Sequence, residues 1–394
     1  MVPVGPVGLI DLEGARSFAR QVNDYLYRRR LEYFDRGPTA FELQPGFLRR
    51  DYRLSFECER LDTGEGKARL NATARGHDIY ILCDILNYSC TYQLFGKTKP
   101  MSPDEHYQDL KRVILAISGK ARRINVIMPF LYESRQHKRN GRESLDSAFM
   151  LEELHALGVT NILTFDAHDP RVANAIPISG FENIPATYQI IKAMKRHMPN
   201  LSERNENLMI ISPDEGAIQR AMYFSTLLNA PLGTFFKRRD FTRIVDGRNP
   251  ILNHEFLGDE ADGKNVLIFD DMIASGDSML DIAWEMKERN AGHVHCAATF
   301  ALFSHGFERF DQAYEKGIIE RVYSTNLIYH HPDLLKRPWY VDVNMAKYVA
   351  LLIDAINHDA SLSALLDPTA KIRRLLSNSP DVREAAQTAD GGDM

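Results

Sequence analysis

The densest group of chemically useful side chains lies in residues 266–278, which read VLIFDDMIASGDS. Four apolar residues are typical of a buried parallel strand, and the carboxylates Asp270 and Asp271 follow them directly, where a sugar's hydroxyls or a bound magnesium ion would lie. Apolar residues then recur at helical spacing from Met279 to Met286, so the intervening turn opens onto a helix N-terminus. Backbone N–H groups of a first helical turn favour a phosphate dianion. This order predicts a site for a phosphorylated ribose.

The turn itself contains small and hydroxyl-bearing residues, starting with Ala274. Ser275 and Ser278 could donate hydrogen bonds to a phosphate, and Gly276 allows close approach of the backbone. The competing interpretation is an ordinary strand-to-helix turn with solvated acids. An acid pair alone would favour that interpretation, but the complete order of strand, acids, Ser-Gly turn and helix favours the phosphate site.

Two further polar clusters follow strand-like runs in the first half of the chain, where open parallel sheets bind ligands. Residues 132–139 come after the apolar run 124–130 and could hold nucleotide phosphates or an adenine edge. His168 comes after the run 161–165 and could ligate magnesium or contact a triphosphate oxygen. Taken alone, residues 132–139 would more often be a solvated basic loop, and His168 would more often be a hydrogen-bonded structural histidine.

The second half of the chain supplies two more such clusters. Asp214 ends the strand-like run 208–211 and could reach a metal or a sugar hydroxyl. Three cations, at residues 237–239, follow the run 232–236 and precede a loop expected over residues 240–263. A basic triplet is usually solvated, but a mobile loop carrying Lys and Arg can also clamp a polyphosphate transition state.

Length and composition bound the class of protein. The chain has 394 residues, enough for two domains, with 44% hydrophobic and 26% charged residues and a formal charge of −5. This composition is typical of a soluble globular protein and gives no reason to expect a nucleic-acid partner. The four cysteines form no C-x-x-C pair, so we expect reduced thiols in a cytoplasmic protein. No signal peptide or membrane span is expected, because no apolar run is long enough.

Strand-like and helix-like segments alternate along the chain, which predicts an α/β fold with parallel sheets covered on both faces. The pattern runs twice, and the loop-like stretch 177–185 separates the two runs. The expected parts are a first domain at 1–182 with an insertion near 25–51, a second domain at 183–366 whose helix near 343–358 is a candidate to pack back on the first, and a flexible polar tail at 367–394.

Jointly, these clusters resemble the ribose-phosphate pyrophosphokinase family, also called phosphoribosyl pyrophosphate synthetases. The resemblance consists of six motifs in family order, at residues 64–80, 134–139, 166–168, 212–214, 237–239 and 270–278. Six ordered motifs are far more specific than any one of them. The resemblance implies two similar phosphoribosyltransferase-type domains, each a mainly parallel sheet flanked by helices. It also implies transfer of pyrophosphate from Mg-ATP to the anomeric hydroxyl of ribose 5-phosphate, which gives 5-phosphoribosyl 1-diphosphate and AMP.

The same resemblance assigns a role to each site residue and implies Mg²⁺ as the cofactor. Catalysis falls to Lys237 and Arg239; ATP binding to Glu65, Arg135, Gln136, Arg139 and His168; magnesium binding to His168 and Asp214; and ribose 5-phosphate binding to Asp270, Asp271, Ala274, Ser275, Gly276, Asp277 and Ser278. In the family the Gly-Glu segment reaches the nucleotide of a neighbouring subunit, which implies a homo-oligomer with a dimer as the minimal unit and a hexamer as the usual state.

Two departures from the family pattern and two alternatives stand beside this assignment. Residues 62–65 read DTGE where the family usually has Asp-Gly-Glu, and Asp277 adds a negative charge near the phosphate unless its side chain points away. A phosphoribosyltransferase that uses the diphosphate product could share the 266–278 site, although the ATP motifs argue against it. A non-catalytic regulatory paralogue of the synthetase is the other alternative.

Overall fold

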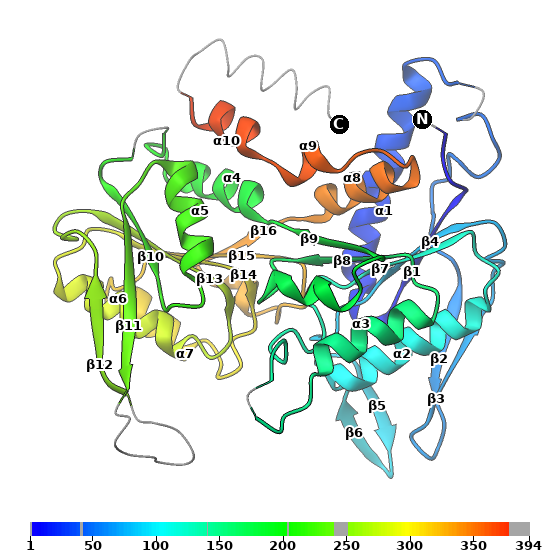
Figure 1. Ribbon diagram of the computed structural model, residues 1–394, viewed down its shortest axis with the longest axis horizontal. Helices are drawn as coiled ribbons and strands as arrows, with labels where there is room; N and C mark the ends of the chain where they lie inside the picture. The colour runs from blue at the N-terminus through cyan, green and yellow to red at the C-terminus, as the bar shows by residue number, and fades with distance from the viewer. Residues whose placement is uncertain (1, 40–41, 140, 203–204, 240–250, 378–394) are drawn as a thin grey trace.

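The computed structural model describes residues 2–39, 42–139, 141–202, 205–239 and 251–377. For residues 237–239 and 251–254 the description is limited to the backbone. Figure 1 shows two α/β domains side by side, each built on one central sheet. This arrangement confirms the predicted fold of two mainly parallel sheets flanked by helices.

The N-terminal sheet has five strands, and every neighbouring pair is parallel. In spatial order the strands are β1 (Val7–Asp11), β4 (Asp78–Leu82), β7 (Arg123–Ile127), β8 (Asn161–Phe165) and β9 (Gly180–Ile184). The helices are α1 (Arg16–Asp35), α2 (Pro103–Ile117) and α3 (Asp146–Ala156). Successive side chains of a strand point to opposite faces, so Ile79 and Ile81 pack with α2 and α3 while Tyr80 and Leu82 pack on the side of α1.

Short elements complete the N-terminal domain. One antiparallel hairpin pairs β2 (Phe56–Arg60) with β3 (Gly66–Leu70), and a second pairs β5 (Thr91–Leu94) with β6 (Lys97–Pro100). The 3-10 helices η1 (Glu13–Ala15) and η2 (Pro170–Ala175) follow β1 and β8.

The C-terminal sheet has seven strands, all parallel except β12, which pairs antiparallel with β11. In spatial order they are β12 (Ile251–Leu257), β11 (Leu232–Arg239), β10 (Leu208–Ser212), β13 (Asn265–Ile273), β14 (Val294–Ala301), β15 (Arg321–Thr325) and β16 (Tyr340–Val343). One face packs with α4 (Thr187–His197), α5 (Ile218–Leu228) and α10 (Thr369–Leu376), and the other with α6 (Asp277–Glu288) and α7 (Glu308–Glu315). The remaining elements are η3 (Leu334–Lys336), α8 (Ala346–Asn357) and α9 (Ser363–Leu366).

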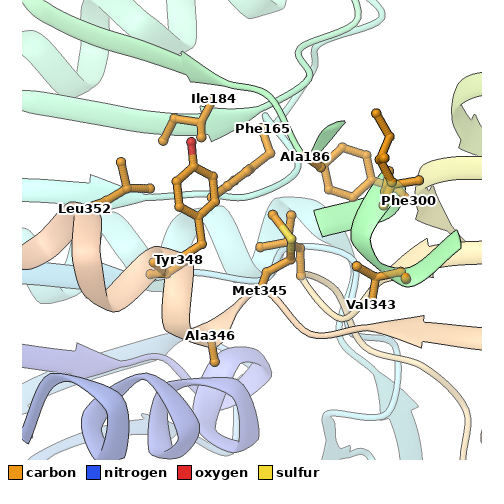
Figure 2. Close-up of a cluster of buried hydrophobic side chains, with 14 of the residues drawn as sticks. Phe165, Ile184, Ala186, Phe300, Val343, Met345, Ala346, Tyr348 and Leu352 are labelled. Atoms are coloured by element: carbon orange, nitrogen blue, oxygen red, sulfur yellow. The ribbon is translucent and has the colours of Figure 1, made fainter. Parts of the chain in front are cut away.

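One of the hydrophobic clusters extends from one domain into the other. Figure 2 shows Phe165 and Ile184 of the N-terminal sheet near Tyr348 of α8, with Phe300 and Val343 of the C-terminal sheet in the same cluster. Helix α8 therefore packs in a core shared with both sheets, and it lies beside α1 (Figure 1). Because the domains share buried apolar surface, their relative position is fixed by packing rather than by the connecting chain alone.

A buried polar group ties α8 to the N-terminal sheet. Asp78, at the start of β4, is fully buried and accepts hydrogen bonds from Arg123 (Nε, 2.9 Å), Asn125 (Nδ2, 2.9 Å), Tyr80 (Oη, 2.7 Å) and, from α8, Asn357 (Nδ2, 2.9 Å). Burial alone would raise the pKa of Asp78, but the hydrogen bonds from Arg123 and Asn357 outweigh it and lower this pKa. A charged carboxylate is therefore stabilised in the interior by its partners.

The segment at residues 25–51 corrects one expectation from the sequence. Its first part is the second half of α1, not a surface extension, because Leu26 and Arg30 are fully buried. The Arg30 guanidinium donates to the carbonyl oxygen of Phe47 (3.0 Å) and to Oδ1 of Asn357 (2.5 Å). A buried arginine on the inner face weakens the apolar periodicity that would have marked this helix.

Other expected limits also differ from the structure. The flexible tail does not begin at residue 367, since residues 369–376 form α10, with Ile372 and Leu376 buried beside α4 and α5. The boundary expected between residues 182 and 183 falls inside β9, so the N-terminal sheet continues to Ile184. Residues 251–257, expected within a loop, form β12.

Asp84 makes the stability of the domain contact depend on pH. It follows β4, is 5% exposed, and accepts hydrogen bonds from the backbone N–H of Leu86 (2.9 Å) and, in the C-terminal domain, of Tyr329 (2.7 Å). Burial raises the pKa of Asp84 to about 7. Between about pH 4 and this value the folded chain holds a proton that the unfolded chain has released, so the free energy of unfolding falls as pH rises.

We therefore expect Asp84→Asn to remove this pH dependence, because the amide does not titrate. Its single oxygen can accept only one of the two bonds, since the N–H groups of Leu86 and Tyr329 meet different carboxylate oxygens, so the urea midpoint of the variant should be lowest relative to wild type at pH 4 and should gain on it towards pH 8. Urea unfolding at several pH values measures this, with the exposed Asp62→Asn as a matched control. An equal shift at pH 4 and pH 8 would contradict the titration of Asp84.

Candidate active site

One predicted site residue of each domain meets the other at the carboxyl ends of β8 and β13. His168 lies in the loop after β8, and its Nδ1 is 2.8 Å from Oδ2 of Asp271 in β13. The His168 side chain is 36% exposed, whereas that of Asp271 is 6% exposed. The loop that carries His168 therefore lies over the acid pair of the C-terminal domain. Of the two contacting side chains, His168 is the one more accessible to solvent.

Arg220 of α5 fixes this meeting point, although its role was not predicted. Its Nη2 donates to the carbonyl oxygens of Ala167 (2.7 Å) and His168 (2.9 Å), and the same nitrogen is 3.7 Å from Oδ2 of Asp271. The one available signal in the sequence was a cation six residues after Asp214, on the helix that follows the same strand. Spacing along one helix cannot show that the cation points to a loop of the other domain.

The pKa values of the adjacent carboxylates Asp270 and Asp271 are shifted in opposite directions. Burial and the neighbouring charge of Asp271 raise the pKa of Asp270 well above its usual value. Burial would also raise the pKa of Asp271, but the hydrogen bond with His168 and the charge of Arg220 outweigh burial and lower this pKa. The pair thus favours a single negative charge, as expected for two carboxylates held side by side.

Asp214 lies in the turn between β10 and α5. Its Oδ1 accepts hydrogen bonds from the backbone N–H of Gly216 (2.9 Å) and Ala217 (3.3 Å), which holds the carboxylate at the carboxyl end of the sheet. Its charge also contributes to the raised pKa of Asp270, so Asp214 acts electrostatically on the acid pair. Among the described residues, no three or more His, Cys, Asp or Glu side chains form a ready-made metal site.

The turn after β13 contains a glycine that both its backbone conformation and its packing against Phe310 require. Gly276 has φ +85°, a left-handed conformation that favours glycine, and a Cβ there would lie 2.3 Å from Cε2 of Phe310. Asp277 is the first residue of α6, and its backbone N–H is 3.4 Å from Oγ of Ser275. Its carboxylate forms an ion pair with Arg309 of α7. Ala274 and Ser275 are half-buried, whereas Ser278 is exposed.

The loop after β7 places a second histidine at the site. Arg135, Gln136 and Arg139 are exposed. The ring of His137, which was not predicted, lies 5.3 Å from the ring of His168, and its Nε2 is 3.5 Å from a carboxylate oxygen of Asp169. The sequence feature that could have indicated His137 was its position inside the basic loop 132–139.

Comparison with known proteins decides the family. Residues 8–158 match the family model of the N-terminal domain of ribose phosphate pyrophosphokinase, and residues 180–332 match that of the phosphoribosyl transferase domain. A ribose-phosphate pyrophosphokinase of Mycoplasma pneumoniae is 30% identical over 274 residues, which cover 67% of this chain and 74% of the relative. The chain belongs to the ribose-phosphate pyrophosphokinase family.

Other members of the ribose-phosphate pyrophosphokinase family match at greater length. The protein of Thermotoga maritima is 27% identical over 319 residues, covering 78% of this chain and 90% of the relative. The crystal structure of phosphoribosylpyrophosphate synthetase from Mycobacterium smegmatis has a TM-score of 0.68 and 19% identity, covering 90% of this chain and 99% of that one. The latter likeness supports the fold.

Three residues assigned by the family resemblance lie away from the His168–Asp271 contact or beyond the description. Glu65 is in the turn of the β2–β3 hairpin, accepts a hydrogen bond from Thr63 Oγ1 (2.9 Å), and belongs to a hairpin that Figure 1 shows far from β13. The side chains of Lys237 and Arg239 lie outside the described residues, as do residues 240–250; the backbone at Lys237 and Arg239 pairs with β12. No helix of the described ranges is long and apolar enough to cross a membrane.

Proposed function

We propose that the chain transfers the diphosphoryl group of ATP to the anomeric hydroxyl of ribose 5-phosphate. In the reaction the hydroxyl oxygen attacks the β-phosphorus, the bond from that phosphorus to the α-phosphate oxygen breaks, AMP leaves, and the hydroxyl proton is released. The main support is the contact of His168 with Asp271, because it joins the residues proposed for the nucleotide to those proposed for the sugar. Such a transfer depends on bringing the two substrates into line.

The C-terminal domain would bind ribose 5-phosphate, and the N-terminal domain would bind the nucleotide. Asp270 and Asp271 would accept hydrogen bonds from sugar hydroxyls, and the turn at 274–278 with the start of α6 would bind the 5-phosphate. The nucleotide side would be formed by Arg135, Gln136, Arg139 and His168, with Glu65 supplied by a neighbouring subunit. Lys237 and Arg239 would stabilise the charge that develops on the transferred group.

The donor set suits magnesium bound together with substrate phosphates. Mg²⁺ prefers oxygen ligands and is commonly held by one or two carboxylates plus phosphates and water, so a ready-made protein cluster is not required. His168 and Asp214 would hold the ion beside the acid pair. When bound, the ion would neutralise negative charge on the polyphosphate.

The direct test is AMP formation from ATP that depends on both ribose 5-phosphate and Mg²⁺. Phosphorus NMR should show 5-phosphoribosyl 1-diphosphate appearing in equal amount. A folded chain that forms no AMP under these conditions would overturn the proposal. Release of pyrophosphate from 5-phosphoribosyl 1-diphosphate and a nucleobase would support a phosphoribosyltransferase instead, and stimulation of an active synthetase without AMP formation would support a regulatory paralogue.

Lys237→Ala should lower turnover by about 10²–10³-fold, because a cation aimed at the transferred group acts in the transition state. A Tm equal to that of wild type would assign the lost turnover to the reaction rather than to folding. Steady-state AMP formation and thermal unfolding measure the two quantities, with Lys99→Ala in the exposed strand β6 as the control. Wild-type turnover in Lys237→Ala would remove this residue from the proposed machinery.

A homo-oligomer and a cytoplasmic location stay predictions from the sequence and the family resemblance. Light scattering of the purified chain would measure the number of subunits.

A further inference from the structure

Asp277 is the feature of the proposed ribose 5-phosphate site that most needs an explanation. It is the first residue of α6, and the N-terminus of that helix is where the sugar phosphate would bind. A carboxylate at a helix N-terminus is stabilised by the same partial positive charge that attracts a phosphate. Left unpaired, Asp277 would both compete for this position and repel the incoming dianion.

Arg309 removes this conflict. It lies in the first turn of α7, and its Nη1 forms an ion pair with Oδ1 of Asp277. Its Nη2 is 3.6 Å from Oδ1 of Asp281, one turn further along α6. The other group near the Asp277 carboxylate is Nδ1 of His305, at 3.8 Å. The guanidinium therefore draws the Asp277 side chain towards α7 and balances its charge.

The packing of α7 keeps Arg309 in this place. Its neighbour Phe310 is fully buried, stacks on Trp339 with ring centroids 5.4 Å apart, and presses on Gly276, where a Cβ would come within 2.3 Å of the ring. Asp311 accepts a hydrogen bond from Nε1 of Trp339 (2.8 Å). The turn that would bind phosphate and the helix that carries Arg309 thus pack directly against each other.

We propose that Arg309 is a positioning residue that makes the 274–278 turn fit for a sugar phosphate by neutralising Asp277 and holding it aside. The inference rests on the proposed function and deepens it. The pair is half exposed, with 54% of the Arg309 side chain and 40% of the Asp277 side chain accessible. An exposed ion pair contributes little to stability, so a purely structural role predicts almost no effect of its loss.

The test is a double-mutant cycle at these two positions. Arg309→Gln should raise the KM for ribose 5-phosphate by about tenfold, with a smaller change in kcat and none in the KM for ATP, because the unpaired carboxylate repels the sugar phosphate. Adding Asp277→Asn to Arg309→Gln should restore the KM to within about threefold of wild type. Arg309→Lys should retain most of the affinity, since it keeps the positive charge.

Each other outcome would overturn the proposal. An unchanged KM in Arg309→Gln would reduce the pair to a surface contact, and a raised KM that Asp277→Asn fails to restore would mean that Arg309 touches the phosphate itself. Calorimetric titration of the full chain with ribose 5-phosphate, and with inorganic phosphate alone, gives the same comparison without turnover. If wild type binds ribose 5-phosphate but forms no AMP, the proposed reaction fails while the cycle still decides the role of Arg309.

Discussion

His168→Ala should lower the rate of AMP formation by about 10²–10³-fold, the usual effect of removing one preorganised polar group from a site that transfers charged groups. His168 contacts Asp271 across the domains and, in the proposed function, the magnesium-bound nucleotide, so the loss should fall mainly on kcat and the KM for ATP. The folded chain should survive, because the side chain is 36% exposed. Steady-state kinetics together with thermal unfolding measure both effects.

His155→Ala is the matched control, since His155 is an exposed histidine of α3 whose side chain contacts Ser179. It should retain wild-type kinetics. Asp271→Asn should resemble His168→Ala, and the double variant should lose less than the product of the two effects, because the residues act as a unit. Fully multiplicative losses would contradict a shared role, and an active His168→Ala would remove the residue from the site.

Asp78→Ala should destabilise the chain by about 3–5 kcal/mol, the cost of breaking a buried ion pair by removing one partner. The carboxylate is the common acceptor for Arg123, Asn125, Tyr80 and Asn357, so its loss leaves a guanidinium and several donors without their partner inside the protein. Urea unfolding followed by circular dichroism would measure the change as a lower midpoint.

Asp62→Ala, in the exposed β2–β3 turn, controls for loss of a carboxylate alone and should unfold like wild type. Below the unfolding transition, Asp78→Ala should keep AMP formation, because Asp78 lies at the amino end of β4 rather than at the carboxyl ends that carry the site. An unchanged urea midpoint in Asp78→Ala would show that the buried network makes no net contribution to the free energy of unfolding.

The sequence by itself indicated the main buried strands and the local part of the site. Continuous apolar runs such as residues 266–269 and 208–211 are typical of strands buried on both faces, and their alternation with helical segments predicted the parallel sheets. His168 and Asp214 lie in the loops after β8 and β10, and Asp271 lies near the carboxyl end of β13; these positions also follow from local order. Because parallel strands end at one edge of a sheet, residues after them gather there whatever the rest of the chain does.

The tertiary structure alone decided how the two halves of the site meet and what supports them. Arg220 acts on a loop of the other domain, Arg309 balances Asp277 from the next helix, and Arg30 is buried against Asn357, which lies more than three hundred positions further along the chain. These contacts leave no periodic trace in the sequence, since each depends on hydrogen bonds between segments that only folding brings together. The second half of α1 and helix α10 were misjudged for the same reason: the burial of residues such as Arg30 and Ile372 depends on partners elsewhere in the chain, not on local composition.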